Sequence, residues 1–124
     1  MPAIPLIRGD IVLVDLSGAT GGEQQNDAAI GGRPCLVVQN DSGNRASPLT
    51  IVAAIADGRQ YKNYPQQVLV TAQELGPGSK ESVILLGHLR TIDRDKRIKK
   101  HLGHLAPAAM ARVDVAIKSS LSLR

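Results

Sequence analysis

Short aliphatic runs separated by turn residues constrain the fold of this chain more than any other feature. The runs include "GDIVLVDL", "PCLVVQN", "LTIVAAIA" and "SVILLGHLR". The chain has no Phe or Trp, and its only aromatic residues are Tyr61 and Tyr64. The core must therefore be built from Val, Ile, Leu and Ala, and short runs of these residues between turns favour strands.

The pattern predicts several strands and few long helices. The run at 34–40 is apolar without interruption, which indicates a strand buried on both faces. The segment 41–48 is rich in turn residues and is expected to be a connector, and 57–67 is expected to be a loop. The predicted strands are 9–16, 34–40, 49–56, 68–71, 82–90 and 99–105.

Two helices have recognisable starts. Thr71 and Glu74 have the spacing of a capping box, and glycine and proline at 76–78 end that helix at once. The charged segment 93–98 predicts a turn or a short helix. Pro107 opens the one long helix, whose apolar stripe is expected to serve the core or a dimer interface: Met110, Val113, Ile117 and Leu121. Together these elements predict a small β-barrel or strongly curved sheet with a C-terminal helix, in a single domain spanning 1–124.

Composition sets limits on function. The chain has 124 residues and a net charge of +4, which is compatible with a nucleic-acid partner bound mainly through phosphate contacts and hydrogen bonds. Cys35 is the one cysteine, so no internal disulfide is possible, and its place in an apolar run predicts a buried side chain. No apolar segment reaches the ~18 residues of a membrane span, and no signal-peptide pattern opens the chain, so we expect a cytoplasmic protein.

Classical catalytic and metal-binding motifs are absent from the sequence. There is no phosphate-binding glycine motif, zinc-ligand spacing or nucleophile elbow. The three histidines are scattered, and His101 and His104 are predicted to be surface residues of a strand rather than metal ligands.

One local feature suggests a site. The polar, glycine-rich segment 17–32 ends at Arg33-Pro34, at the entrance of the strand 34–40. We expect this loop to be mobile without a ligand. Taken alone, Arg33 could pair with a surface carboxylate, or it could bind a phosphate through its fork of donors.

The ordered set of motifs resembles the MazF/PemK toxins of bacterial toxin–antitoxin pairs, especially the branch typified by Gram-positive bacteria. The resemblance extends from about Arg8 to Leu121 and rests on these segments: "RGDIVLVDL", "GGEQ", "RPCLVVQND", "GNRASP", "TIVAAI" and "SVILLGHLRTID". It implies an SH3-like barrel that forms a homodimer. It also implies metal-independent, sequence-specific cleavage of single-stranded RNA to 2′,3′-cyclic phosphate and 5′-hydroxyl ends, without a cofactor. The implied partner is an antitoxin of the MazE type, whose tail lies in the RNA groove.

The resemblance assigns roles to individual residues. Arg33 matches the family's catalytic arginine, and we expect it to stabilise charge on the reacting phosphate, because an arginine is a poor general base. Arg45 matches a family position that we interpret as structural. The positions implied to contact RNA are Gly22, Glu23, Gln24, Asp57, Pro65, Gln67 and Ser82.

The chain departs from the family pattern at three places. Ala56 stands where the family has a catalytic threonine, and losing such a donor typically costs ~10²–10³ in rate, which predicts a slow or inactive enzyme. Gly87-His88 replaces Glu-Gln, and His88 is expected to be either a general acid or base or an RNA contact, with Asp57 a weaker candidate for the proton transfer. The loop between Glu23 and Arg33 is longer than in relatives, which predicts an altered RNA sequence preference.

Two other functions stay open at this level. One is a relative that binds antitoxin or RNA without cutting, which Ala56 suggests. The other is a barrel toxin that poisons DNA gyrase. The basic cluster at 94–100 is either a solvated charged face or a surface that steers RNA.

Overall fold

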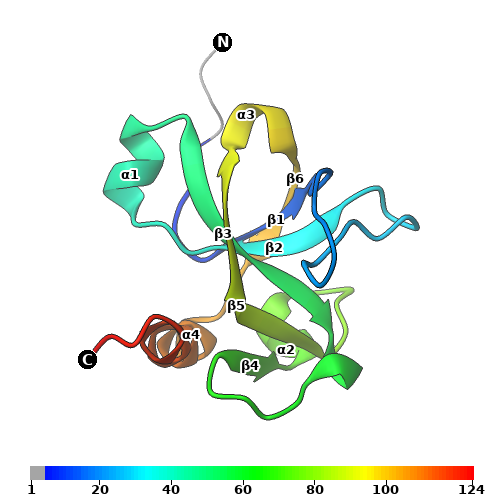
Figure 1. Ribbon diagram of the computed structural model, residues 1–124, viewed down its shortest axis with the longest axis vertical. Helices are drawn as coiled ribbons and strands as arrows, with labels where there is room; N and C mark the ends of the chain where they lie inside the picture. The colour runs from blue at the N-terminus through cyan, green and yellow to red at the C-terminus, as the bar shows by residue number, and fades with distance from the viewer. Residues whose placement is uncertain (1–4) are drawn as a thin grey trace.

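The computed structural model describes residues 5–124, which form one curved antiparallel sheet with short helices around it (Figure 1). The strand order is β4-β5-β3-β2-β1-β6. The elements in chain order are β1 (Asp10–Val14), β2 (Arg33–Val37), α1 (Asp41–Ala46), β3 (Leu49–Asp57), the 3-10 helix η1 (Gly58–Gln60), β4 (Gln67–Val70), α2 (Ala72–Leu75), β5 (Ser82–Asp93), α3 (Arg94–Arg97), β6 (Ile98–His104) and α4 (Pro107–Ser120).

The mainly β fold with a C-terminal helix is confirmed, but "barrel" describes it loosely. β4 and β6 are the outer strands and do not pair with each other, so the sheet formed by the described residues stays open. Its curvature comes from twist and from irregular pairing: β1–β6 and β3–β5 both contain register shifts. Figure 1 shows β3 and β5 crossing β1 and β2 steeply, which folds the sheet around its core.

Aliphatic side chains alternate between two hydrophobic clusters on the two faces of the sheet. In β2, Leu36 belongs to the cluster that α4 covers, whereas Cys35 and Val37 belong to the cluster on the opposite face. All three are fully buried, which confirms that this strand is buried on both faces. Burial raises the pKa of the Cys35 thiol to about 12, against the opposing charges of Arg33 and Arg90. Cys35 is therefore an inert packing residue.

The C-terminal helix packs mainly through small residues. Val113, Ala109 and Ala116 are buried, and Met110 and Ile117 pack against the same cluster. Leu121, which was predicted to continue the stripe, follows the helix end and is exposed. No helix among the described residues is long and apolar enough to cross a membrane.

One predicted connector is wrong. The segment 41–48 contains the helix α1, which the side chain of Asn40 caps by accepting a hydrogen bond from the Gly43 N–H at 2.7 Å. The buried Asn44 accepts from the hydroxyl of Thr50 at 2.7 Å and donates to the carbonyl of Gln39 at 3.0 Å. These local side-chain hydrogen bonds, over five and six positions, outweigh the low helix propensity of Gly and Asn.

The prediction for His101 and His104 was incomplete. Their side chains are about half exposed, but both contact Asp10 of β1, whose side chain is 4% exposed. The Asp10 carboxylate lies 2.9 Å from His104 Nδ1 and 3.3 Å from His101 Nε2, and it accepts from the Ile7 N–H at 3.0 Å. Asp10 thus ties the N-terminal segment to the edge strand β6.

Replacing Asp10 with alanine is expected to reduce the free energy of unfolding by about 1–3 kcal/mol at neutral pH. Burial raises the pKa of Asp10, but the hydrogen bonds from Ile7, His104 and His101 outweigh it and hold that pKa below its ordinary value. A lowered pKa contributes stability above the unfolded-state value of about 4, and this contribution disappears as the pH falls through the folded-state pKa. Urea unfolding from pH 7 to pH 3 should therefore show the gap between the two proteins narrowing at acid pH, and a constant gap would contradict this role.

Candidate functional site

Arg33 is the first residue of β2, and backbone carbonyls hold its guanidinium. Its Nε donates to the Gln25 carbonyl of the long loop at 2.9 Å, and its Nη1 lies 3.5 Å from the Ile55 carbonyl of β3. Among the described residues Arg33 makes no ion pair, so the structure does not show the pairing with a surface carboxylate that the sequence alone allowed. The guanidinium keeps its charge and further N–H donors for a ligand.

The end of the loop delivers Arg33 to this position through a tight turn. Asp27 and Gly32 form an isolated bridge, in which the Asp27 N–H donates to the Gly32 carbonyl at 2.7 Å. A side chain at Gly32 would place its Cβ 2.8 Å from the Val14 carbonyl oxygen of β1, so only glycine permits this close approach. The backbone conformation of this turn therefore fixes where Arg33 lies.

Hydrogen bonds tie the loop and the residues that follow β1 to each other and to β5. The Asn26 side chain accepts from the Leu16 N–H at 2.7 Å and donates to the Asp15 carboxylate at 2.9 Å. Arg90 of β5 donates to the Leu16 carbonyl at 3.0 Å. Between these anchors, the Glu23 side chain makes only long contacts to Thr20, at 3.4 Å, and its N–H donates to the Thr20 carbonyl at 3.1 Å. The predicted contact residues Gly22, Glu23 and Gln24 thus lie in the least anchored part of the loop.

Arg33 and Ala56 share one cavity of about 640 Å³. Ala56 lies in β3 opposite Val83, is 3% exposed, and belongs to a small cluster with Val83 and Leu85. Its methyl group offers no hydrogen bond to a ligand in that cavity. The cavity is also lined by the predicted residues Asp57 and Ser82 and by two cations that the sequence analysis missed, Arg59 and Lys80.

Asp57 is paired with both of these cations. Its carboxylate lies 3.0 Å from Arg59 Nε and 2.8 Å from Lys80 Nζ. The hydrogen bonds from Arg59, and then that from Lys80, hold the pKa of Asp57 well below its usual range. A carboxylate with such a low pKa is a poor general base, so the sequence-based suggestion that Asp57 transfers a proton loses its chemical basis.

Of the remaining predicted contacts, Ser82 lines this cavity and Gln67 lines the neighbouring one, whereas Pro65 lines neither. The buried Ser82 donates its hydroxyl proton to the Lys80 carbonyl at 2.9 Å. Gln67 lines the neighbouring cavity and accepts from the Lys62 N–H at 2.8 Å. Pro65 is exposed just before β4.

His88 lies at an irregularity of β5. Ala53 pairs with Leu89 while Ala54 pairs with Leu85, so the residues between those two partners, His88 included, bulge out of the ladder. His88 lines two further cavities, of about 550 and 590 Å³, together with Gln24. It does not line the cavity of Arg33 and Ala56.

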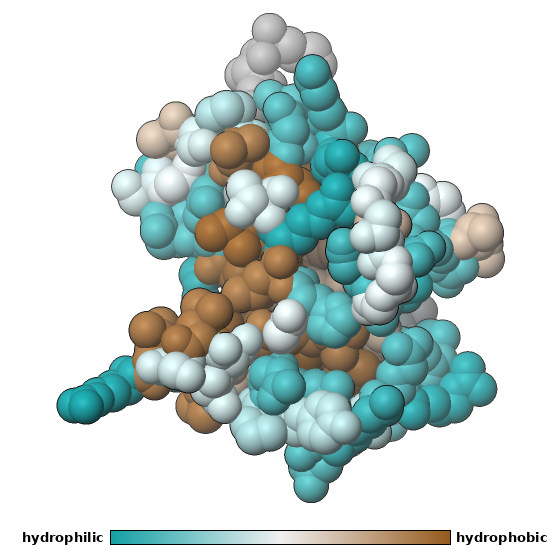
Figure 2. All heavy atoms as spheres, in the orientation of Figure 1, coloured by the Kyte–Doolittle hydropathy of each residue, from teal (hydrophilic) through white to brown (hydrophobic). Residues whose placement is uncertain are grey.

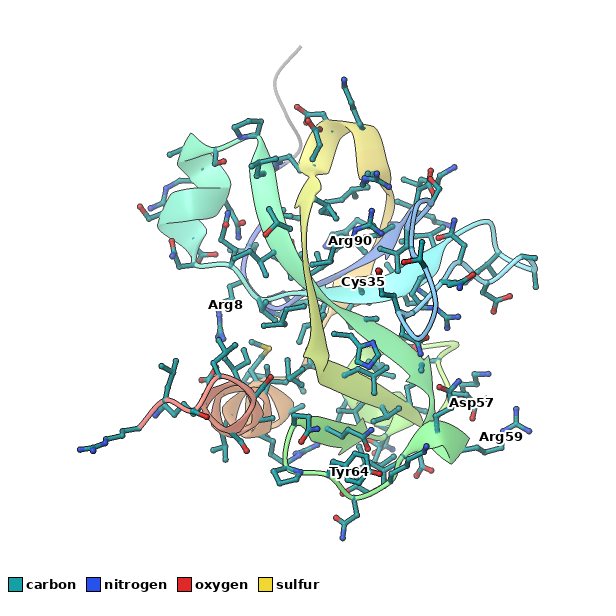
Figure 3. The ribbon with its side chains drawn as sticks, viewed as in Figure 1. Arg8, Cys35, Asp57, Arg59, Tyr64 and Arg90 are labelled. Atoms are coloured by element: carbon teal, nitrogen blue, oxygen red, sulfur yellow. The ribbon has the colours of Figure 1, made fainter. Side chains whose placement is uncertain are left out.

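The three cavities share lining residues and therefore adjoin one another, and we call the three together the groove. Gln24 and His88 line the first and second cavities, and Arg59 and Gln60 line the second and third. Figure 3 shows Asp57 and Arg59 at one margin and Arg90 near the centre of the molecule. The cations that line the groove come from four parts of the chain: Arg33, Arg59, Lys62, Lys80 and Arg90. A groove with this lining suits an extended polyanion.

The basic cluster at 94–100 is only partly available to a ligand. Arg97 donates to the carbonyls of Asp15 and Ser17, both at 3.0 Å, and Arg94 donates to the carbonyl of Asn44. Lys96, Lys99 and Lys100, by contrast, are exposed. In the described part of the chain, no group of three or more His, Cys, Asp or Glu side chains is arranged to hold a metal ion.

The amino-acid sequence matches a known protein family and its relatives over most of the chain. The family model for PemK-like, MazF-like toxins of type II toxin–antitoxin systems matches residues 7–121. Endoribonuclease EndoA of Bacillus subtilis (strain 168) is 44% identical over 116 residues, which cover 94% of this chain and 94% of the relative. Endoribonuclease MazF of Staphylococcus epidermidis is 43% identical over 116 residues, covering 94% and 91%.

Solved structures share the fold. MazF from Deinococcus radiodurans superposes with a TM-score of 0.78 at 24% identity, covering 98% of this chain and all of that one (100%). An endoribonuclease in complex with its cognate antitoxin, from a mycobacterial species, superposes with a TM-score of 0.72 at 20% identity, covering 96% and 97%.

Proposed function

Because this chain belongs to the family of PemK-like, MazF-like toxins of type II toxin–antitoxin systems, we propose that it is an endoribonuclease that cuts single-stranded RNA in the groove described above. One observation carries the proposal: Arg33, held by two carbonyls and free of any ion pair among the described residues, lines a cavity within a groove of cations. A guanidinium in this setting suits the non-bridging oxygens of a phosphodiester.

The chemistry we propose is internal transfer of the phosphoryl group. The 2′-oxygen of one nucleotide attacks the adjacent phosphorus, and the bond from phosphorus to the 5′-oxygen breaks. The 2′-hydroxyl loses its proton and the 5′-oxygen gains one, which leaves a 2′,3′-cyclic phosphate and a 5′-hydroxyl. Negative charge builds on the phosphate during this step, and we propose that Arg33 stabilises it. No metal or cofactor takes part in this scheme.

Incubation of the purified protein with a long RNA of mixed sequence in EDTA tests the proposal. Sequencing of the 5′-hydroxyl ends should show discrete cuts at a short motif. An intact RNA would favour the relative that binds without cutting, which Ala56 suggests. Inhibition of DNA gyrase together with intact RNA would replace the proposal with the gyrase-poisoning alternative.

We also propose the partners that the family implies. Figure 2 shows apolar atoms gathered over α4 and the adjoining sheet, and Leu121 and Leu123 at the end of the chain are exposed. An apolar surface of this kind suits a homodimer interface. We propose that the cationic groove binds the tail of a MazE-type antitoxin as well as RNA; the mycobacterial endoribonuclease of similar fold is in complex with its cognate antitoxin. We also propose that the protein acts in the cytoplasm, where an RNA substrate and an antitoxin would meet it, as one domain over 1–124.

We propose that His88 contacts RNA and does not transfer a proton, because it lines cavities shared with Gln24 and not the cavity of Arg33. Replacing His88 with alanine is expected to change the preferred cleavage motif and to leave the pH–rate profile unchanged. Sequencing of the 5′-hydroxyl ends and single-turnover rates from pH 5 to pH 9 measure the two effects. Loss of an ionisation near neutral pH in the variant would instead identify an acid or base.

A further inference from the structure

Two cations stand beside Arg33 in its cavity, and one carboxylate holds them both. Asp57 ends β3, Arg59 belongs to η1, and Lys80 precedes β5. The Asp57 carboxylate lies 2.8 Å from Lys80 Nζ, and it contacts Arg59 through both Nε, at 3.0 Å, and Nη2, at 3.2 Å. We call these three residues the Asp57 clamp.

The backbone around the clamp is fixed. Asp57 caps η1 by accepting from the Arg59 N–H at 2.9 Å, and it pairs with Ser82 across the sheet. The Gly58 N–H donates to the Glu81 carbonyl at 3.1 Å, and a Cβ at Gly58 would lie 3.0 Å from that oxygen. β3, η1 and the start of β5 are therefore joined closely at this corner of the groove.

Lys80 has a second support. The hydroxyl of the buried Ser82 donates to the Lys80 carbonyl at 2.9 Å, which fixes the backbone that carries the ammonium group. The side chain of Asp57 is 22% exposed, whereas that of Lys80 is 74% exposed. A lysine has three N–H donors, and one oxygen of Asp57 occupies one of them. Lys80 is thus held in place and still able to bind an anion.

Arg59 is more exposed than Lys80 and lies where two cavities adjoin. Its side chain is 90% exposed, and it lines both the cavity of Arg33 and the neighbouring cavity of Gln24 and His88. Figure 3 shows its side chain extending from the corner at Asp57 toward solvent. This guanidinium is therefore within reach of a ligand in either cavity.

The acidic side chains in the cavity of Arg33 do not cancel the positive charge of its cations. Besides Asp57, the lining contains Asp27, whose carboxylate accepts from the Ala29 N–H at 2.9 Å. Three cationic and two acidic side chains therefore line the cavity, with a net positive balance at a place where Ala56 offers no donor. Arg33 alone would leave the reacting phosphate with a single source of donors.

We propose that Lys80 is a further catalytic residue of this nuclease, that it binds the scissile phosphate opposite Arg33, and that Arg59 binds the next phosphate along the groove. Asp57 is the positioning residue that holds both cations. The clamp rests on the proposed function, and it explains how a chain with alanine at position 56 stabilises a phosphate that gains charge. Lys80 and Arg33 supply donors from two sides, and Arg59 fixes the register of the strand.

The test uses a short oligonucleotide with one ribonucleotide at the cleavage site found by sequencing, and compares single-turnover rates with affinities. Lys80→Gln is expected to lower the rate at saturation by about 10–100-fold with little change in affinity, and Lys80→Arg to restore part of it. Arg59→Gln is expected to weaken binding severalfold and to reduce the slope of log affinity against log salt by about 0.7, as for one lost phosphate contact. Arg45→Gln, which removes the same charge from the exposed side of α1 and outside the three cavities, is the matched control for rate.

Asp57→Asn separates positioning from simple electrostatics. The amide still accepts the hydrogen bond that caps η1, but it loses the charge that pairs with Lys80 and Arg59. If the charge of Asp57 only lowers the positive electrostatic potential of the cavity, the variant binds RNA more tightly and cuts at least as fast. The clamp predicts the opposite, a rate about three- to tenfold lower. Asp114→Asn, which breaks an ion pair of equal length between α4 and Arg8, controls for the change in net charge.

The outcomes distinguish the clamp from the nuclease itself. Cutting that depends on Arg33 but proceeds at the normal rate in Lys80→Gln and Asp57→Asn would overturn the clamp and leave the proposed function standing. Failure of the unmodified protein to cut would overturn both. Equal melting temperatures of the variants and the unmodified protein ensure that a lower rate reports the site and not the fold.

Discussion

Replacing Arg33 with alanine is expected to lower the rate of RNA cleavage by about 10³-fold or more, with little change in stability. Within the described residues the guanidinium donates only to two backbone carbonyls, at 2.9 and 3.5 Å, so its loss leaves no buried charge without a partner. The effect should appear in the rate at saturating RNA, because the charge that Arg33 stabilises develops during the reaction. Single-turnover cleavage of the RNA motif in EDTA measures it.

Two further substitutions show what Arg33 contributes. Arg33→Lys keeps the charge but loses the planar fork of donors, so its rate should lie between those of the unmodified protein and the alanine variant. Arg45→Ala removes an equal charge from the exposed side of α1 and should leave cleavage unchanged. Equal losses in Arg33→Ala and Arg45→Ala would show that the net charge of the protein, and not the site, controls the reaction.

Replacing Ala56 with threonine is expected to raise the rate of cleavage by about 10²-fold, because it adds a hydroxyl donor to the cavity of Arg33. The added atoms must fit beside Val83, Leu85 and the ring of Tyr61, which pack around Ala56. This crowding should cost about 1–3 kcal/mol of the free energy of unfolding. Single-turnover rates and urea unfolding measure the two effects separately.

Valine is the matched control for this change. Ala56→Val has the shape of threonine without the hydroxyl, so it shares the crowding and should gain no activity. A rate that rises equally in both variants would mean that packing, not hydrogen bonding, limits the enzyme. The gain from threonine should be larger in Lys80→Gln, since two donors to one phosphate partly replace each other.

The strands of this protein could be predicted because their signals are local. Val, Ile, Leu and Ala in short runs marked 34–40, 49–56 and 82–90 as strands, and β2, β3 and β5 lie there. The capping box at Thr71 is present as predicted, with both of its hydrogen bonds. These features depend on neighbours within a few residues, which a sequence displays directly.

The features that the sequence did not predict depend on particular side-chain hydrogen bonds, some local and some between distant residues. The helix α1 depends on the bonds of Asn44 to Gln39 and Thr50. The contact between His104 and Asp10 joins residues 94 positions apart, and neither residue has a local signal that indicates the other. Propensity and periodicity carry no information about such pairs.

The candidate site, too, could be predicted only in part from the sequence. From sequence alone came the family resemblance, the glycine-rich loop that ends at Arg33, and the missing hydroxyl at Ala56. Only the tertiary structure decided which side chains share a cavity: it placed Ala56 with Arg33, placed His88 elsewhere, and joined Lys80 to Asp57 across 23 positions. The physical reason is strand register. The pairing of β3 with β5 and the bulge between them determine which side chains meet, and that pairing is a property of the whole sheet.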